Sequence, residues 1–269
     1  METIERIDEW RESYQRWKRI NEMRGDDLGE HYPWVENRRA AFTPVRRALP
    51  MLNLALITSA GAYVDGSEPF DVEIPGGDAS FREIPTLIEA EDLRWAARGY
   101  DPAAVNEDMN SQVPIERLFE FEGNGIIGQL NPVFWSFCGF IPSAARFADK
   151  TLPQLVERVK RYSAQAALII PASRLCHQSM GLAARALEAA GIPTILLSVD
   201  KEAVERVRAP RAVYYKGEFG SVAGLPKFPE HQRRILDETL RLLEPWDQVD
   251  VRKLTVALQT TVEEARGER

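Results

Sequence analysis

The sequence predicts an α/β protein, with a Rossmann-like or flavodoxin-like parallel sheet, helices on both faces of it and an N-terminal helical arm. Short apolar runs at 52–58, 166–170 and 194–198 have the length and composition of strands buried on both faces. Helical periodicity spans 176–190, between the last two runs, and Gly191 suits the end of that helix. This strand–helix–strand order predicts two parallel strands joined by a crossover helix.

The first 50 residues form the predicted arm. One helix face is indicated by apolar side chains at steps of three and four residues, namely Trp10, Tyr14, Trp17 and Ile20. A second helical stretch is expected near Val35–Leu49. An aromatic stripe of this kind is typical of a packing surface, so the arm should cover the domain or a second subunit.

Residues 51–269 form the predicted α/β domain, which could divide into halves at 51–150 and 151–250. The stretch 63–115 is rich in turn-forming residues and reads as a long functional or covering loop region. Further helices are expected at 114–122, 152–162, 230–244 and 251–269.

Composition excludes several classes of function. The chain has 34 basic and 41 acidic residues, a net charge of −7, and so lacks the basic field that nucleic-acid binding requires. No apolar run reaches the ~20 residues of a membrane span, and the N-terminus has no apolar signal core. Two cysteines make no disulfide framework, and no cysteine–histidine cluster has metal-ligand spacing. We therefore expect a cytoplasmic protein without metal, membrane or nucleic acid.

The most informative segment surrounds Cys176, which lies between a predicted strand and the helix that follows. Unpaired N–H groups at a helix N-terminus favour a thiolate and lower the pKa of a cysteine. Ser173 lies three residues earlier, at the spacing of a CxxC pair, and His177 could hold a proton near the sulfur. The alternative is structural: Cys176 as a small buried side chain, Ser173 as a helix cap and His177 facing solvent.

Polar residues of the loop-rich region are candidates for substrate binding. An arginine there could clamp a carboxylate, while an aspartate or asparagine could bind an amine. Capping helices and tying down loops is the alternative role for such side chains. The candidates are Asp78, Ser80, Arg82, Asp108, Asn110 and Arg117.

Several ordered motifs resemble the selenoprotein B family, the selenoprotein subunits of D-proline reductase and of glycine, sarcosine and betaine reductases. The segment 166–198, which contains SRLCHQS and GLAARALEAAGIPT, resembles the redox-motif region of that family. Further similarity lies in the first strand and turn (54–61), in GDASFREIP (77–85), in YD followed by DMN, in 114–118 and in GIIG (125–128). Where the family has a histidine before Gly-Tyr-Asp, this chain has Ala96, Ala97 and Arg98.

The resemblance implies reductive cleavage of a carbon–nitrogen bond, with the substrate amine held by a pyruvoyl group on a partner subunit. It places Ser173 at the position of the selenocysteine or first cysteine and Cys176 at that of the companion cysteine. A serine cannot enter a disulfide, so Cys138 is the possible resolving thiol. Neither cysteine follows Ser or Thr, so we expect no intrinsic cofactor, and any pyruvoyl group would come from another chain.

Three hypotheses follow. The first is thiol-dependent reductive chemistry at Cys176 on a small amino-acid-like substrate. The second is a non-catalytic binding or structural subunit that has lost the redox pair. The third is racemase-like proton transfer between Cys138 and Cys176. We also expect a homo-oligomer.

Overall fold

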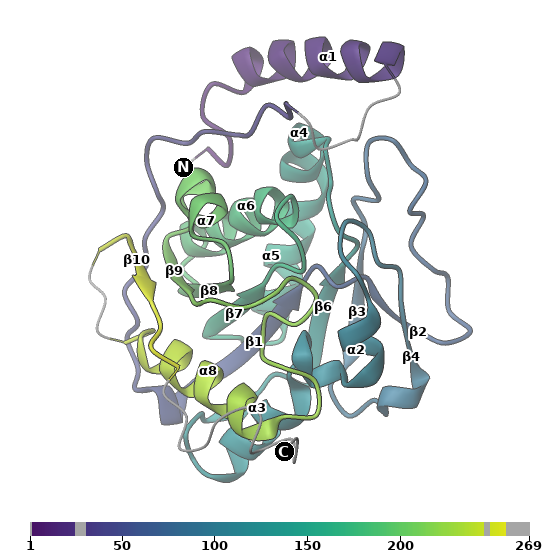
Figure 1. Ribbon diagram of the computed structural model, residues 1–269. Coiled ribbons are helices and arrows are strands. Elements are labelled where there is room, and N and C mark those ends of the chain that lie inside the picture. Colours follow the sequence, from purple (N-terminus) through teal and green to yellow (C-terminus); the bar gives the residue numbers. More distant parts are fainter. Residues whose placement is uncertain (1, 25–30, 245–247, 257–269) are drawn as a thin grey trace.

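The computed structural model describes residues 2–24, 31–244 and 248–256. Within these ranges one eight-stranded sheet has the order β10-β9-β8-β7-β1-β6-β3, and β5 also pairs with β1. All pairs in it are parallel except β3 with β6. The sheet confirms the predicted α/β class (Figure 1). Its strands are β1 (Asn53–Thr58), β3 (Phe81–Pro85), β5 (Gln129–Leu130), β6 (Val133–Phe137), β7 (Ala166–Ile170), β8 (Thr194–Ser198), β9 (Arg211–Tyr214) and β10 (Asp250–Lys253).

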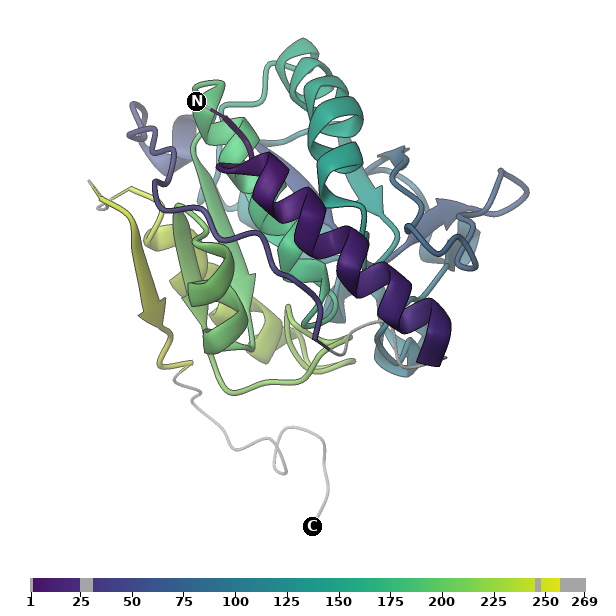
Figure 2. The same ribbon diagram turned by 90° about the horizontal axis from the view of Figure 1, so that it is seen from above.

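Helices cover both faces of the sheet, and α1 forms a further layer above one of them (Figures 1 and 2). A separate two-stranded ribbon pairs β2 (Ala62–Val64) with β4 (Leu93–Trp95). The described α-helices are α1 (Ile7–Arg24), α2 (Ala103–Glu107), α3 (Ile115–Gly123), α4 (Ala144–Arg146), α5 (Leu152–Arg161), α6 (Cys176–Ala189), α7 (Lys201–Val207) and α8 (Pro229–Arg241). Short helical turns are η1 (Leu49–Met51), η2 (Ala90–Asp92), η3 (Met109–Ser111) and η4 (Phe147–Thr151).

The sheet separates two apolar cores because successive side chains of a strand point to opposite faces. On β1, Ala55 and Ile57 face the core shared with α5, α6 and α7. Leu54 and Leu56 face the core shared with α3 and α8. All of β1 except its first residue is buried, which explains why it reads in the sequence as a continuous apolar run.

The first half of the predicted arm is helical. Trp10, Tyr14 and Trp17 are buried on one side of α1, and their rings stack with centroids 5.0 and 5.7 Å apart. Ile20, predicted on the same face, is 43% exposed. Tyr32 packs edge-on against both Trp17 and Phe140, and so links this helix to the body of the domain.

The second predicted helix of the arm, near Val35–Leu49, is wrong, because residues 31–48 contain neither helix nor strand. This strap, as we call residues 31–48, runs beside α6 and α7 (Figure 2). Buried side chains of α6 bind its backbone: Gln178 Oε1 accepts from Val35 N at 2.6 Å, and Glu188 Oε2 accepts from Thr43 N at 2.5 Å. These bonds satisfy N–H groups that a helix would have satisfied internally.

Most other predicted elements are confirmed. Strands β7 and β8 have the predicted bounds and pair in parallel, and α3, α5, α6 and α8 lie where periodicity indicated. The predicted C-terminal helix is wrong where it can be compared, because residues 250–253 form β10, which pairs with β9 at the sheet edge. Residues 257–269 lie outside the described ranges. No described helix has the length and apolar character that crossing a membrane would require.

Candidate functional site

Both cysteines lie at the carboxyl edge of the sheet. Cys176 begins α6 shortly after β7, and Cys138 directly follows β6. Strand β1 lies between β6 and β7, and Ala60, just past β1, forms an isolated bridge with Cys138. The ends of three neighbouring strands thus bring the two thiols to one place, where ligands bind in open α/β sheets.

Cys176 is fully buried and hydrogen-bonded. Its Sγ lies 2.9 Å from Ser173 Oγ, and its backbone N–H donates to the same oxygen at 3.3 Å. Burial raises the pKa of the thiol, while hydrogen bonds from Ser173 and Ser59 act in the opposite direction. The sequence analysis expected a lowered pKa from the helix N-terminus. In the folded chain desolvation outweighs that effect, because the charged form loses its water.

Cys138 has a similar environment. Burial, and after it negative charge at Cys176, raise the pKa of Cys138 to about 12, so the two thiols interact electrostatically. Cys138 Sγ lies 3.2 Å from the carbonyl oxygen of Ala96. A thiol donates such a bond, so this contact also favours the neutral form of Cys138.

Residues 96–100, which we call the cover loop, lie over the thiols. Tyr100 donates its hydroxyl to Ala60 O at 2.6 Å, and the charges of both cysteines act on its pKa in addition to burial. A Cβ added at the exposed Gly99 would lie 3.4 Å from Ser173 Oγ. The loop therefore passes next to Ser173, whose hydroxyl contacts the Cys176 sulfur.

His177 turns away from the sulfur. Its Nδ1 lies 2.9 Å from Ser173 O, and its Nε2 lies 2.7 Å from the hydroxyl of Ser198 on β8. Burial lowers the pKa of His177 to about 4, so the ring is neutral at neutral pH. A neutral ring that donates from Nδ1 to the carbonyl accepts at Nε2 from Ser198. The histidine thereby fixes the turn at 173–177 against β8.

Three of the predicted substrate-binding residues, Asp78, Ser80 and Arg82, form one group. Asp78 accepts from the N–H groups of Ser80 and Asp71 at 2.9 and 3.1 Å. Arg82 donates to Ser80 Oγ at 2.8 Å. The charges of Asp78 and Arg82 also act on the pKa of Cys138, which places this group near the thiols.

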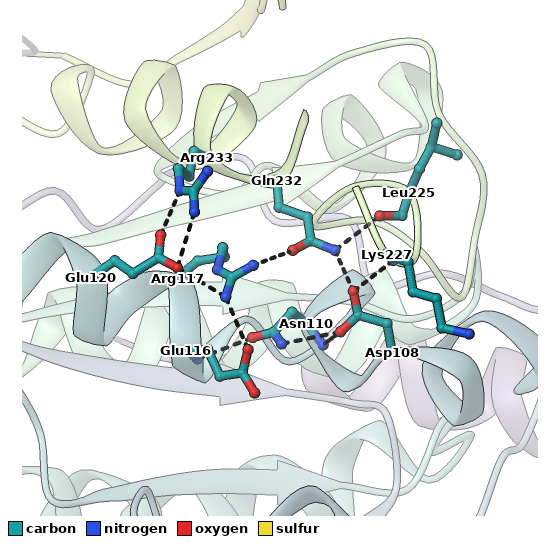
Figure 3. A network of polar contacts seen from close by, with 9 residues as sticks. All are labelled: Asp108, Asn110, Glu116, Arg117, Glu120, Leu225, Lys227, Gln232 and Arg233. Atoms are coloured by element: carbon teal, nitrogen blue, oxygen red, sulfur yellow. Dashed lines mark hydrogen bonds and ion pairs between the residues drawn. The ribbon is translucent and has the colours of Figure 1, made fainter. Parts of the chain in front are cut away.

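The other three, Asp108, Asn110 and Arg117, form a separate network that ties α3 and η3 to α8 (Figure 3). Asp108 accepts from Asn110 N at 2.9 Å and from Gln232 Nε2 at 2.7 Å. Arg117 lies 2.9 Å from Glu120 in a mostly buried ion pair. These contacts match the structural alternative, and substrate binding by this second group stays a prediction.

Sequence reasoning did not single out Ser59, Arg98 or Tyr100. Ser59 belongs to the small-residue turn after β1. Turns at the carboxyl ends of strands bind ligands in open α/β sheets, so this position was a signal in the sequence. Arg98 was visible only as a departure from the family pattern. The electrostatic effect of Arg98 lowers the pKa of Cys138 and opposes the larger effect of burial.

Residues 20–171 match the model of the glycine/sarcosine/betaine reductase selenoprotein B family. The D-proline reductase subunit gamma of Acetoanaerobium sticklandii is 32% identical over 202 residues, which cover 75% of this chain and 82% of that protein. The glycine reductase complex component B subunit gamma of Symbiobacterium thermophilum is 26% identical over 180 residues, 65% of this chain and 41% of that protein.

A third relative is the betaine reductase complex component B subunit beta of Peptoclostridium acidaminophilum, 27% identical over 179 residues, 65% of this chain and 40% of that protein. The matched segments thus span about two fifths of these glycine and betaine reductase subunits. No solved structure gave a significant match. With a family model over more than half of its length and the D-proline reductase subunit as a relative, this chain belongs to the glycine/sarcosine/betaine reductase selenoprotein B family.

Proposed function

We propose that this chain carries out thiol-dependent reductive chemistry at Cys176 on a small amino-acid-like substrate, as one subunit of a multi-component reductase. The observation that carries the proposal is the placement of Cys138 and Cys176 after β6 and β7, the two strands that flank β1, under one cover loop. The relatives support it, since they are named as subunits of D-proline, glycine and betaine reductases.

Two thiols supply the two electrons and two protons of a reductive cleavage. The carbon–nitrogen bond of the substrate breaks, the carbon gains one hydrogen, and the nitrogen leaves as an amine with the other. Cys138 and Cys176 are oxidised together to a disulfide, which an external dithiol then reduces by exchange. Ser173 Oγ, 2.9 Å from the sulfur, stabilises the thiolate of Cys176 during this cycle.

The substrate amine would be held by a pyruvoyl group on a partner subunit. Cys176 and Cys138 follow Leu175 and Phe137, whereas in the family's way of forming that group the cysteine follows Ser or Thr. Both thiols are buried, so residues of the cover loop must move before a substrate reaches them. Docking of the partner against this edge of the sheet would couple assembly to that opening.

Mild oxidation of the folded chain tests the redox pair. We expect a Cys138–Cys176 disulfide, detected as a linked peptide by mass spectrometry and absent after reduction. A disulfide requires Cα atoms within about 7 Å, so it forms only if the thiols can meet. Cys138→Ser and Cys176→Ser are matched controls that cannot form it. If the oxidised wild type contains only unlinked cysteines, Cys138 is not the resolving thiol.

Turnover tests the function itself. The chain is purified from its source cells with its bound partners. Dithiol-dependent carbon–nitrogen cleavage is measured as release of ammonia or amine from glycine, sarcosine and betaine, and as ring opening to a primary amine with D-proline. We expect Cys176→Ala to lower the rate more than 100-fold, because the nucleophile is lost. Ser179→Ala is the control, since that hydroxyl only bonds Cys176 O within the same helix. Equal rates in both variants would contradict the proposal.

A non-catalytic binding or structural subunit is the second candidate. Full burial of both thiols, the raised pKa values and a serine at the first motif position favour it. This candidate predicts that the chain still assembles with its partners after Cys176→Ala, with no disulfide and no thiol-dependent turnover in the wild type.

A further inference from the structure

We infer that Arg98 is a specificity-determining residue that binds the carboxylate of a small substrate beside Cys138. This inference rests on the proposed function, because it requires a substrate to enter under the cover loop. Arg98 would recognise the anionic group of that substrate. It is not one of the six polar residues that were selected from the sequence.

Arg98 is held close to Cys138 through its main chain. It lies in the cover loop, two residues after Ala96, whose carbonyl contacts the Cys138 sulfur. Gly139, the residue after Cys138, approaches Arg98 so closely that an added Cβ would lie 2.4 Å from Arg98 O and 2.7 Å from Arg98 Cβ. With a φ of +52°, Gly139 also adopts a conformation that side chains disfavour. The backbone next to Cys138 thus fixes the position of the Arg98 main chain and Cβ.

The guanidinium of Arg98 retains donors for a ligand. Within the described part of the chain its side chain makes one hydrogen bond, from Nη1 to Ile74 O at 3.0 Å. A guanidinium has five N–H donors in a planar fork that fits a carboxylate with two parallel bonds. Arg98 is half-buried, so that fork is partly shielded from water.

Arg82, the other arginine that acts electrostatically on Cys138, is committed elsewhere. It donates from Nε to Glu68 O at 3.2 Å, from Nη2 to Pro69 O at 3.1 Å and from Nη1 to Ser80 Oγ at 2.8 Å. Its guanidinium also stacks on the Phe70 ring at 4.2 Å. The donors of Arg82 tie down the loop, whereas those of Arg98 are available.

The local charge favours an anion. The charged side chains that act most strongly on Cys138, apart from Cys176, are Arg98, Asp78 and Arg82, with a net charge of +1. Asp78 is engaged by hydrogen bonds from Ser80 and Asp71, and despite burial these leave its pKa lowered, so it stays ionised. A carboxylate bound by Arg98 would balance the remaining positive charge next to the sulfur.

Two alkylating reagents of nearly equal size test the inference. Iodoacetate carries a carboxylate and iodoacetamide a neutral amide, and both must pass the same cover loop. The measured quantity is the ratio of their alkylation rates at Cys138, followed by peptide mass spectrometry at pH 8.5. We expect Arg98→Gln to lower this ratio about tenfold, and Arg98→Lys to lower it less, because lysine keeps the charge but lacks the planar fork.

Arg94→Gln is the matched control. It removes the same charge from β4, close in sequence, where Arg94 pairs with Asp65 at 2.7 Å. We expect the wild-type ratio in this variant. Added salt should lower the wild-type ratio toward that of the urea-unfolded chain, which tests the charge effect even if a variant folds poorly.

The outcomes separate the two proposals. If both reagents modify Cys138 and the ratio is the same in wild type, Arg98→Gln and the unfolded chain, the role of Arg98 is overturned and the proposed function stands. If neither reagent modifies Cys138 or Cys176 in the chain purified with its bound partners, small molecules do not reach the thiols in the assembled protein, and both proposals are overturned.

Discussion

Glu188 and Arg211 form a fully buried ion pair with a 2.6 Å contact behind the strap. Glu188 also accepts from Thr194 N at 2.7 Å and from Thr43 N at 2.5 Å, so one carboxylate joins α6, β8, β9 and the strap. Burial raises the pKa of Glu188 to about 7, and the charge of Arg211 opposes that rise. The charge of Arg211 therefore helps to keep the buried Glu188 ionised.

Removing one partner should be costly. We expect Glu188→Ala to lower the free energy of unfolding by about 3–5 kcal/mol, because Arg211 would stay buried without a counter-charge. Urea denaturation measures the loss. Glu157→Ala is the control: its pair with Arg161 is exposed on both sides and should contribute less than about 1 kcal/mol. Similar losses in the two variants would show that the buried pair has no special role.

His177 makes stability depend on pH. Its folded pKa of about 4 lies below the ordinary value of 6.5, so the unfolded chain takes up a proton first as the pH falls. The stabilisation is present above pH 6.5 and is lost as the pH falls toward 4. We expect the wild type to lose about 2 kcal/mol more than His177→Asn between pH 7 and pH 5. Parallel stability curves for the two proteins would exclude a neutral buried imidazole.

At the scale of elements, α6 serves three purposes. Its N-terminus carries Cys176, its apolar residues join the core, and its buried polar side chains hold the strap. Gly181 lies in this helix against α7, where an added Cβ would be 2.8 Å from Val207 Cβ. The glycine permits close packing of the two helices.

Gly181→Ala should therefore destabilise the protein, although alanine favours helices in isolation. We expect a loss of about 1–3 kcal/mol from overpacking against Val207. Thermal or urea unfolding measures it. The double variant with Val207→Ala should restore part of the loss, giving a favourable coupling energy. A stabilised single variant would contradict the close approach of α6 and α7.

The confirmed elements carry a signal within their own sequence that some of the missed elements lack. β7, β8 and α6 were predicted because a run of apolar residues or a period of 3.6 is visible within one segment. β9 and β10 lie toward the sheet edge, and β10 is at most half-buried, so its sequence DVRK carries no strand signal of its own. The strap was mistaken for a helix because its hydrogen-bond partners, such as Gln178, lie far away in the chain.

At the scale of the whole molecule, α1 lies over the helices of one face and buries its aromatic side (Figure 2). We expect Trp17→Ala to cost about 3–5 kcal/mol, since Trp17 is 6% exposed and packs on Tyr14 and Tyr32. Met23→Ala, a change in the same helix at an 87% exposed position, should cost less than about 0.5 kcal/mol. Equal costs in urea unfolding would mean that α1 does not belong to the core.

The sequence by itself determined the class of fold, the central strands, the helix that begins at Cys176 and the family. These features depend on residues close together in the chain, whose periodicity and motifs are readable locally. Only the tertiary structure decided that Cys138 lies near Cys176, that Arg98 rather than Arg117 accompanies them, and that burial raises the pKa of both thiols. Desolvation and charge act through space, so they depend on which distant segments the fold brings together.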